Sequence, residues 1–212
     1  LHRFAGAFRG EGKRMSEPDA LLHDFQSITE PLRLEELFTQ PQPTELEIGC
    51  GDGGFLLEYA QHHPERNFLG VERLLGRVRK LSKRGQHAGL NNLRLLRIEA
   101  RYVLDYLLPE RAFSAVHIYF PDPWPKDKHA RHRLIQPDFL PRIRRILAPG
   151  GVLYLRTDDP PYFEQMQETF RGSEEFVEES TPAVLSEITT EFERQWLAEG
   201  KRTHYAAYCL NG

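Results

Sequence analysis

From residue 44 onward, short apolar runs alternate with segments whose apolar residues recur at helical spacing. The first run, residues 44–48, ends in a glycine-rich turn and predicts a β-strand. In the segment 55–62, Phe55 and Tyr59 share one helical face, which predicts a helix. The same patterns predict further strands at 67–71, 92–98, 115–120, 152–157 and 203–210, and helices at 74–86, 102–107, 134–147 and 162–170.

This alternation predicts an α/β fold, with a parallel sheet that carries helices on both faces. A length of 212 residues suits one domain with small additions. Residues 1–43 do not follow the alternation, so we interpret them as an N-terminal extension, packed as a helical or irregular segment. Residues 44–212 then form the domain that carries the function. The acid-rich stretch 174–193 is interpreted mainly as a solvated face.

Composition narrows the function classes. The net charge is −3 and the pI about 6.3, so any binding of nucleic acid must come from local basic clusters. No apolar run approaches the ~20 residues that a membrane span needs. Cys50 and Cys209 lie far apart and have no metal-ligand spacing, so we expect no metal and reduced thiols in a cytoplasmic protein.

A proline-rich stretch, 121–126, follows the predicted strand 115–120. Three prolines restrict φ there, so the side chains between them have few orientations. Asp122 can meet a cationic or hydrogen-bonding edge of a planar aromatic substrate, Trp124 can stack on it, and Lys126 can reach a phosphate. The alternative is a proline-rich surface loop that caps the sheet.

Glycines 49, 51 and 53 follow the first predicted strand. Glycine tolerates positive φ and lets a ligand approach the backbone, and the carboxyl end of such a strand is where cofactors bind in open α/β sheets. Gly49, Gly51 and Gly54 also match the dinucleotide spacing G-x-G-x-x-G. The glycines alone therefore fit either a nicotinamide cofactor or S-adenosylmethionine.

Three glutamates extend this candidate cofactor site. Glu72 ends the second strand, where a carboxylate can accept both ribose hydroxyls of either cofactor. Glu47, just before the glycines, favours a cationic amino-acid moiety and would repel a pyrophosphate. Glu99 follows the third strand and can accept the adenine amino group. Each of them can instead be an ordinary carboxylate at the end of a strand.

Basic residues gather in three clusters. Local clusters on a mildly acidic chain favour a polyanion docked on one face, although solvated helix faces would give the same pattern. The cluster next to the proline-rich stretch fits the polyanion better because it adjoins the proposed site. The clusters are residues 126–133; Arg73, Arg77, Arg79, Lys80, Lys83 and Arg84; and Arg142, Arg144 and Arg145.

Two further segments are candidate substrate contacts. Asp158 follows the fifth predicted strand at the same edge of the sheet. The run Thr190, Glu191, Phe192 and Glu193 combines a hydroxyl, an aromatic ring and carboxylates, and a carboxylate can accept the N1 and N2 hydrogens of guanine. The same spacing also fits a helix start, with Thr190 as the cap and Glu193 in the capping-box position.

These motifs together resemble the tRNA (guanine-N7-)-methyltransferase family, in order from about residue 45 to 194. The proline-rich stretch with its basic run is the specific part, whereas the glycine turn is common to most class I methyltransferases. The motifs are Glu47-Ile48-Gly49-Cys50-Gly51-Asp52-Gly53, Gly70-Val71-Glu72, Phe120-Pro121-Asp122-Pro123-Trp124-Pro125-Lys126, Thr157-Asp158 and Thr190-Glu191-Phe192-Glu193.

The resemblance implies a Rossmann-like fold with a seven-stranded sheet, S-adenosylmethionine as cofactor, and methylation of a guanine in the tRNA variable loop. It implies that Glu47, Glu72, Glu99 and Asp122 line the cofactor site, with Asp122 also the catalytic candidate. Lys126, Asp158 and Thr190 to Glu193 are then substrate contacts. The family usually has aspartate or asparagine where this chain has Glu99. No membrane or metal is implied, and we expect a monomer or homodimer.

Three other classes of protein compete with this interpretation. An NAD-dependent oxidoreductase is favoured only by the literal glycine spacing, and Glu47 opposes it. A methyltransferase that acts on another RNA, a protein or a small molecule stays open because Asp127, Ala130 and His132 dilute the basic run. A noncatalytic RNA-binding module is disfavoured because every proposed cofactor carboxylate is present.

Overall fold

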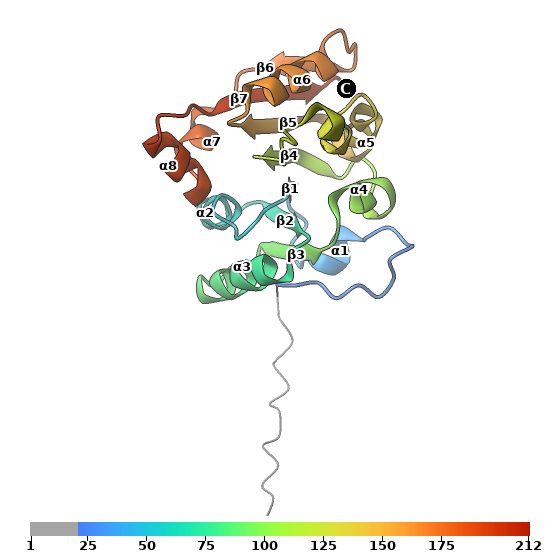
Figure 1. The fold of residues 1–212 in the computed structure, drawn as a ribbon. Coiled ribbons are helices and arrows are strands. Elements are labelled where there is room, and N and C mark those ends of the chain that lie inside the picture. Colours follow the sequence, from blue (N-terminus) through green and yellow to red (C-terminus); the bar gives the residue numbers. More distant parts are fainter. Residues whose placement is uncertain (1–20) are drawn as a thin grey trace, which may run out of the picture.

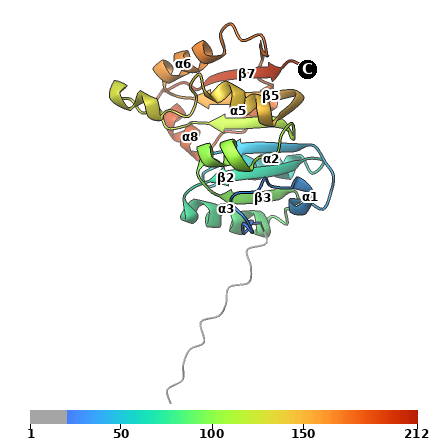
Figure 2. The same cartoon turned by 90° about the vertical axis from the view of Figure 1, so that its right-hand side faces the viewer.

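A seven-stranded sheet forms the centre of the molecule, which we describe for residues 21–212 of a computed structural model. The spatial order is β3-β2-β1-β4-β5-β7-β6 (Figures 1 and 2). Pairing is parallel from β3 to β5 and antiparallel between β5, β7 and β6. The strands are β1 Thr44–Ile48, β2 Asn67–Glu72, β3 Leu93–Arg97, β4 Phe113–Tyr119, β5 Leu147–Thr157, β6 Phe176–Glu179 and β7 His204–Leu210.

Helices cover both faces of this sheet (Figure 1). One face carries α2 (Leu56–His62) and α3 (Leu75–His87), with α7 (Ala183–Glu187) and α8 (Glu191–Ala198) beside them. The other face packs against α1 (Leu34–Leu37), α5 (Phe139–Ile146), α6 (Pro160–Phe170) and α4 (Ala100–Tyr102), which continues as the π-helical turn η1 (Val103–Leu107). A 3₁₀ segment, η2 (Asp127–His132), follows the proline-rich stretch. The predicted fold class is therefore confirmed.

The two apolar clusters differ in their polar content. The α1/α4/α5/α6 face contains Leu46 and Ile48 of β1 within a large cluster of buried apolar side chains. The opposite face carries the alternate residues Glu45 and Glu47, both buried. His117 of β4 joins them there, with Nε2 2.8 Å from Oε2 of Glu45. One face of the sheet is thus a conventional core, and the other contains buried charge.

The predicted helix over residues 134–147 was wrong in its first turn. Helix α5 begins only at Phe139. Pro137 lacks the N–H that a helix interior uses, and it disfavours helical φ and ψ at Gln136. The N–H of Ile135 instead donates to the hydroxyl of Tyr162 at 3.0 Å.

Within residues 174–200 the structure contains one strand and two helices. The sequence patterns did not predict any of them as a complete element. Strand β6 buries only Phe176 of its four residues, so it has almost no apolar pattern to detect. Helix α7 is short and buries Leu185 alone. The acid-rich stretch is therefore a folded edge of the sheet, although most of its glutamates face solvent as expected.

The described part of the N-terminal segment packs on the sheet. The backbone of Leu21 and His23 pairs with both sides of Leu95, at 2.8 and 2.9 Å. Leu32 and Phe38 enter the core of the α1 face. Residues 1–20 lie outside the described residues, and a boundary between an extension and a domain at residue 43 stays a prediction.

Candidate active site

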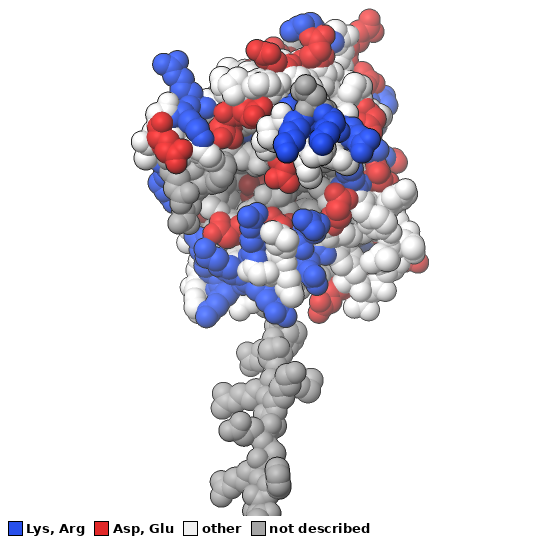
Figure 3. Space-filling view, in the orientation of Figure 1, with Lys and Arg blue, Asp and Glu red and all other residues white. Residues whose placement is uncertain are grey.

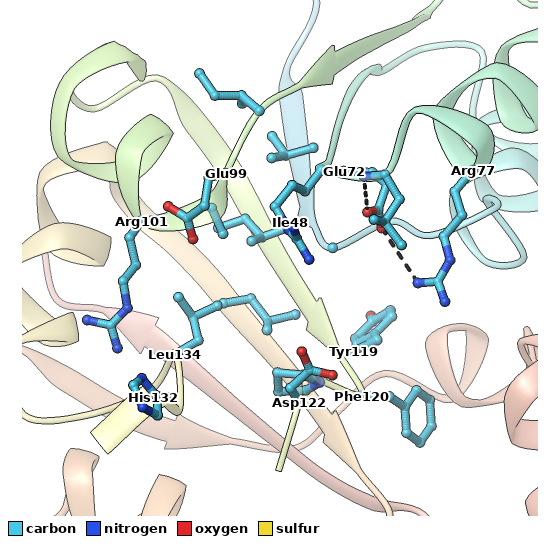
Figure 4. Close-up of a pocket in the computed structure, with 18 of the residues that line it drawn as sticks. Ile48, Glu72, Arg77, Glu99, Arg101, Tyr119, Phe120, Asp122, His132 and Leu134 are labelled. Atoms are coloured by element: carbon cyan, nitrogen blue, oxygen red, sulfur yellow. Dashed lines mark hydrogen bonds and ion pairs between the residues drawn. The ribbon is translucent and has the colours of Figure 1, made fainter. Parts of the chain in front are cut away.

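A cavity of about 450 Å³ opens at the carboxyl ends of β1, β2 and β4. This is the crevice that open α/β sheets use for ligands. It contains four of the predicted site residues, Gly49, Glu72, Glu99 and Asp122, and Figure 4 shows the three carboxylates around it. Its other walls are mainly apolar or basic, and they include Ile48, Arg77, Arg101, Tyr119, Trp124, His132 and Leu134.

The glycine turn enters this cavity through Gly49, whereas Gly51 and Gly53 do not line it. Gly49 and Gly51 have φ of 79° and 57°, in the region that side chains other than glycine rarely adopt. An added Cβ would meet nothing within 4 Å at Gly49, and at Gly51 only a backbone oxygen at 4.0 Å. Gly53 also has positive φ, and there an added Cβ would clash with Leu81. The first two glycines thus leave space for a ligand, and the third allows α3 to pack closely.

Glu72 and Glu99 each organise the backbone around the cavity. Glu72 is buried, and its two oxygens accept the N–H groups of Leu74 at 2.7 Å and Gly51 at 3.2 Å. Glu99 is exposed and accepts the N–H of Tyr102 at 2.9 Å as the cap of α4. Each carboxylate retains lone pairs for a ligand, so the predicted contacts to ribose and adenine are chemically feasible.

Glu47 is buried beneath the glycine turn and has an unsatisfied carboxyl oxygen. Its Oε2 has no hydrogen-bond partner in the described part of the chain. Burial raises the pKa of Glu47 to about 8, while the charge of Arg156 opposes this shift and that of Glu72 adds to it. A buried acceptor without a donor is costly, so a cationic or hydrogen-bonding ligand group would be stabilised here.

The proline-rich turn is held in an unusual backbone conformation. Phe120 and Trp124 both have positive φ, 51° and 44°, although neither is glycine. Such conformations cost about 1 kcal/mol or more and concentrate at functional sites. The turn projects Asp122 toward the cavity (Figure 4), where its carboxylate has no hydrogen-bond or ion-pair partner among the described side chains and backbone. Asp122 is therefore available to a ligand.

Trp124 forms an aromatic cluster with the 3₁₀ segment η2. Its ring lies 5.1 Å from that of His132 and 5.9 Å from that of His129, between centroids. Lys126 is exposed just before η2 but does not line the cavity. Asp158 follows β5 at the same edge of the sheet, also outside the cavity wall. Their roles as substrate contacts stay predictions.

The segment before α8 forms the predicted capping box. The N–H of Glu193 donates to the Thr190 hydroxyl at 3.0 Å, and the N–H of Thr190 donates to Oε2 of Glu193 at 3.3 Å. Glu193 is fully buried, and its Oε1 accepts from Thr203 and Tyr205, both at 2.9 Å. The helix start is thus confirmed; the side chains of Glu191 and Phe192 lie outside the described residues.

The basic clusters separate into structural and available residues. In the third cluster, Arg142 pairs with Asp105 and Asp138, Arg144 with Glu175, and Arg145 donates to backbone carbonyls. Lysines and arginines of α3 and of the η2 region instead lie exposed on both sides of the hollow in Figure 3. The exposed members are Arg73, Arg77, Arg79, Lys80, Lys83, Arg84, Lys126, Lys128 and Arg131. Three of them also have partners: Arg77 pairs with Glu72, Lys80 pairs with Asp52, and Arg84 donates to the backbone oxygen of Asp52.

Sequence reasoning assigned no role to Tyr119 and Arg156. Both lie on the face of the sheet that carries Glu47, and they are register partners in β4 and β5. The Cζ atom of Arg156 lies 4.0 Å from the Tyr119 ring centroid. The sequence contained one signal for Arg156. It is a charged residue next to the end of a buried strand, two positions before Asp158.

The described residues contain no group of three or more His, Cys, Asp or Glu side chains that could hold a metal ion. Within the same part of the chain, no helix is both long and apolar enough to cross a bilayer.

Comparison with known proteins defines the class first. The fold is that of class I methyltransferases: a 16S rRNA methyltransferase, KamB, superposes with a TM-score of 0.60 at 17% identity, over 84% of this chain and 93% of that one. The aminoglycoside-resistance methyltransferase NpmB1 gives 0.54 at 18% identity, over 84% and 91%. A family described as "Putative methyltransferase" matches residues 41–206.

The particular family follows from curated relatives, all named tRNA (guanine-N(7)-)-methyltransferase. The Halorhodospira halophila protein is 38% identical over 84% of this chain and 79% of its own length. The Thermotoga maritima protein is 35% identical over 82% of this chain, and the Marinobacter nauticus protein 44% identical over 66%. The chain spans 56% and 59% of these two proteins. It belongs to the tRNA (guanine-N7-)-methyltransferase family of S-adenosylmethionine-dependent enzymes.

Proposed function

We propose that this chain transfers a methyl group from S-adenosylmethionine to N7 of a guanine in the tRNA variable loop. The observation that carries the proposal is the convergence of Glu72, Glu99 and Asp122 on one cavity above an open glycine turn. Family membership supplies the reaction class, and the relatives' names supply the substrate. Transfer to another RNA or to a small molecule is the alternative.

The residues present fit this cofactor. The open positions at Gly49 and Gly51 leave room for it against the backbone. The unpartnered Oε2 of Glu47 suits an ammonium group, Glu72 can hold the ribose hydroxyls, and Glu99 the adenine amino group. When bound, S-adenosylmethionine supplies an electrophilic methyl group on sulfur.

Asp122 then serves as an orienting and stabilising group, rather than as a general base. N7 of guanine carries a lone pair and no proton, so attack requires no proton abstraction. The requirement is in-line placement of N7, which is a problem of positioning. Positive charge develops on the purine ring during transfer, and a carboxylate beside the ring stabilises it. The strained turn fixes Asp122 for both tasks.

Docking of tRNA is assigned to the two exposed basic groups beside the cavity. Lys126, Lys128 and Arg131 lie near Trp124, and the α3 residues flank the opposite rim. Phosphates held on both sides would place a flipped-out guanine over Asp122, with Trp124 available for stacking. Lys126, Asp158 and Thr190 to Glu193 are proposed to complete the substrate site. A monomer or homodimer is expected.

Incubation of the purified protein with methyl-labelled S-adenosylmethionine and unmodified tRNA tests the function. Chemical cleavage at N7-methylguanine then maps the label. Label at a variable-loop guanine supports the proposal. Label at another position, or cofactor binding without label in tRNA, would reject the proposed substrate and favour the alternative.

A further inference from the structure

A buried histidine in the middle of the sheet has no part in the proposed reaction. His117 of β4 is fully buried, and both nitrogens of its ring are hydrogen-bonded. Its Nε2 lies 2.8 Å from Oε2 of Glu45 in β1, and its Nδ1 lies 2.8 Å from the hydroxyl oxygen of Tyr119. The imidazole therefore links a buried carboxylate to a buried phenol.

The carboxylate fixes the direction of both hydrogen bonds. Burial opposes the ionisation of Glu45, but the hydrogen bonds and charges of His117 and Arg66 outweigh it and hold the pKa of Glu45 below its ordinary value. An ionised carboxylate only accepts, so the Nε2–H group of His117 donates to it. In the neutral imidazole Nδ1 is then the acceptor, and the Tyr119 hydroxyl donates to it.

Aromatic rings hold the imidazole in place. Tyr154 of β5 stacks on His117, with ring centroids 5.3 Å apart and an interplanar angle of 20°. The ring of Phe55 lies 5.1 Å from that of His117, and it meets the Tyr119 ring edge-on at 4.8 Å. Close-packed neighbours leave the imidazole little freedom to turn, so its Nδ1 offers Tyr119 an acceptor at a fixed position.

Tyr119 carries this order to the proposed active site. It lines the cofactor cavity, as Figure 4 shows, whereas Glu45 and His117 do not. It is also the last residue of β4. The next residue, Phe120, has a φ of 51° and begins the strained turn that carries Asp122. A shift of Tyr119 would therefore move a wall of the cavity and the base of this turn.

We propose that His117 is a positioning residue for methyl transfer, and that its hydrogen bond to the Tyr119 hydroxyl holds the cavity wall and the start of the Asp122 turn in place. This inference rests on the proposed function, because it assumes that the cavity binds the cofactor. In-line transfer is sensitive to placement, and a displacement of about 1 Å can cost about 100-fold in rate. A side chain that never touches the substrate can thus influence the rate.

Two amide variants separate this role from that of a histidine that only fills the core. The amide of asparagine lies where Nδ1 of the imidazole lies, so His117→Asn can still bond the Tyr119 hydroxyl. The amide of glutamine reaches the position of Nε2, so His117→Gln can bond Glu45 but leaves Tyr119 without its partner. Both variants lose the ring packing, so urea denaturation should show a similar loss of stability in the two proteins.

The rates of methyl transfer should differ between these variants. In single-turnover reactions, His117→Asn should stay within about threefold of wild type, whereas His117→Gln and Tyr119→Phe should each be slower by about tenfold or more. Tyr208→Phe is the matched control, because the hydroxyl of Tyr208 is buried without a hydrogen-bond partner in the described part of the chain and lies outside the cavity wall; it should keep the wild-type rate. Equal rates in the two amide variants, or a wild-type rate in Tyr119→Phe, would overturn the proposal.

Calorimetric titration with S-adenosylhomocysteine separates this inference from the proposed function. Wild type and His117→Asn should bind it about equally, and His117→Gln and Tyr119→Phe about fivefold or more weakly, because Tyr119 lines the cavity. Equal affinities in all four proteins would overturn the inference even if tRNA proved not to be the substrate. A wild-type chain that binds no S-adenosylhomocysteine would reject the proposed function and this inference with it. If both amide variants fail to fold, Tyr119→Phe measured against Tyr208→Phe decides, because both proteins keep the aromatic ring.

Discussion

At the scale of single residues, the site is defined by carboxylates in different environments. Asp122 is exposed and unpaired within the described residues, on a turn with two strained positions. Glu72 is buried, accepts two backbone N–H groups and retains lone pairs for a ligand, and Glu47 is buried and incompletely paired. These environments fit the proposed roles, in which Asp122 faces the developing charge and the other two acids hold the ligand and the loop.

Replacement of Asp122 by alanine is expected to lower the rate of methyl transfer by about 100-fold or more, because it removes the stabilising charge beside the purine. Unfolding temperature should change little, since Asp122 is exposed. Single-turnover kinetics with labelled cofactor measures the first quantity and thermal denaturation the second. Near-normal turnover would remove Asp122 from the catalytic role.

Glu47 predicts a pH-dependent stability of the ligand-free protein. Its pKa of about 8 in the folded state lies above the ordinary value of 4.5. A raised pKa means that the folded state binds the proton of Glu47 more tightly than the unfolded state does. The contribution of protonated Glu47 to the free energy of unfolding is therefore full below about pH 4.5 and is lost as the pH rises through 8. The slope should approach about 1.4 kcal/mol per pH unit in that window.

Urea denaturation of wild type and Glu47→Gln at pH 5 to 8.5 measures this difference. The variant should show a flatter profile across that window, because glutamine does not titrate. The comparison isolates Glu47 from Arg156 and Glu72, which face it in both proteins. Parallel profiles would show that Glu47 is already paired in the ligand-free protein.

At the scale of elements, the sequence predicted the sheet well and its antiparallel edge poorly. The strands β1 to β4 carry buried runs such as Thr44–Ile48, whose five residues are all buried, and these runs are visible in the sequence. Strand β6 buries one residue in four, so tertiary pairing with β7 rather than any local pattern defines it. Helix α5 begins later than the sequence pattern predicted, because Pro137 blocks the first turn of the predicted helix.

In the candidate site, too, local sequence predicted some features, whereas others depend on tertiary contacts. Glycines 49 and 51 were identified because the turn requires positive φ, which the structure contains. Arg156 could not be assigned from sequence because its partners, Ile188 and Glu193, are more than thirty residues away. Local chemistry was therefore predictable, whereas the buried polar network depends on register between strands.

The capping box before α8 gives a prediction at this scale. Thr190→Ala should destabilise the folded chain by about 1 kcal/mol, because the N–H of Glu193 loses its acceptor. Thr190→Ser should retain most of the stability. Chemical denaturation of both variants measures the effect. A parallel loss of tRNA affinity in alanine but not serine would indicate a second role in the substrate site.

At the scale of the whole molecule, a net charge of −3 coexists with a basic rim around a cavity that contains three carboxylates. The arginines of α5 contribute little to that rim because acidic side chains or backbone carbonyls hold them. A polyanion approaching the molecule would be attracted to the cavity side, where the exposed residues of α3 and η2 remain available.

This distribution predicts which substitutions change the salt dependence of tRNA binding. Lys126→Ala and Lys83→Ala each remove one exposed cation from opposite sides of the cavity. Each should weaken tRNA binding and reduce the slope of log K against log salt by about 1, the value expected for one lost phosphate contact. Arg144→Ala is the control, because its guanidinium pairs with Glu175, and its slope should match wild type.

Filter-binding titrations at several salt concentrations, with S-adenosylhomocysteine affinity as a check on folding, measure all three variants. Equal slopes in the four proteins would place the tRNA on another face, whereas a change for Lys126 alone would confine it to the η2 side of the cavity.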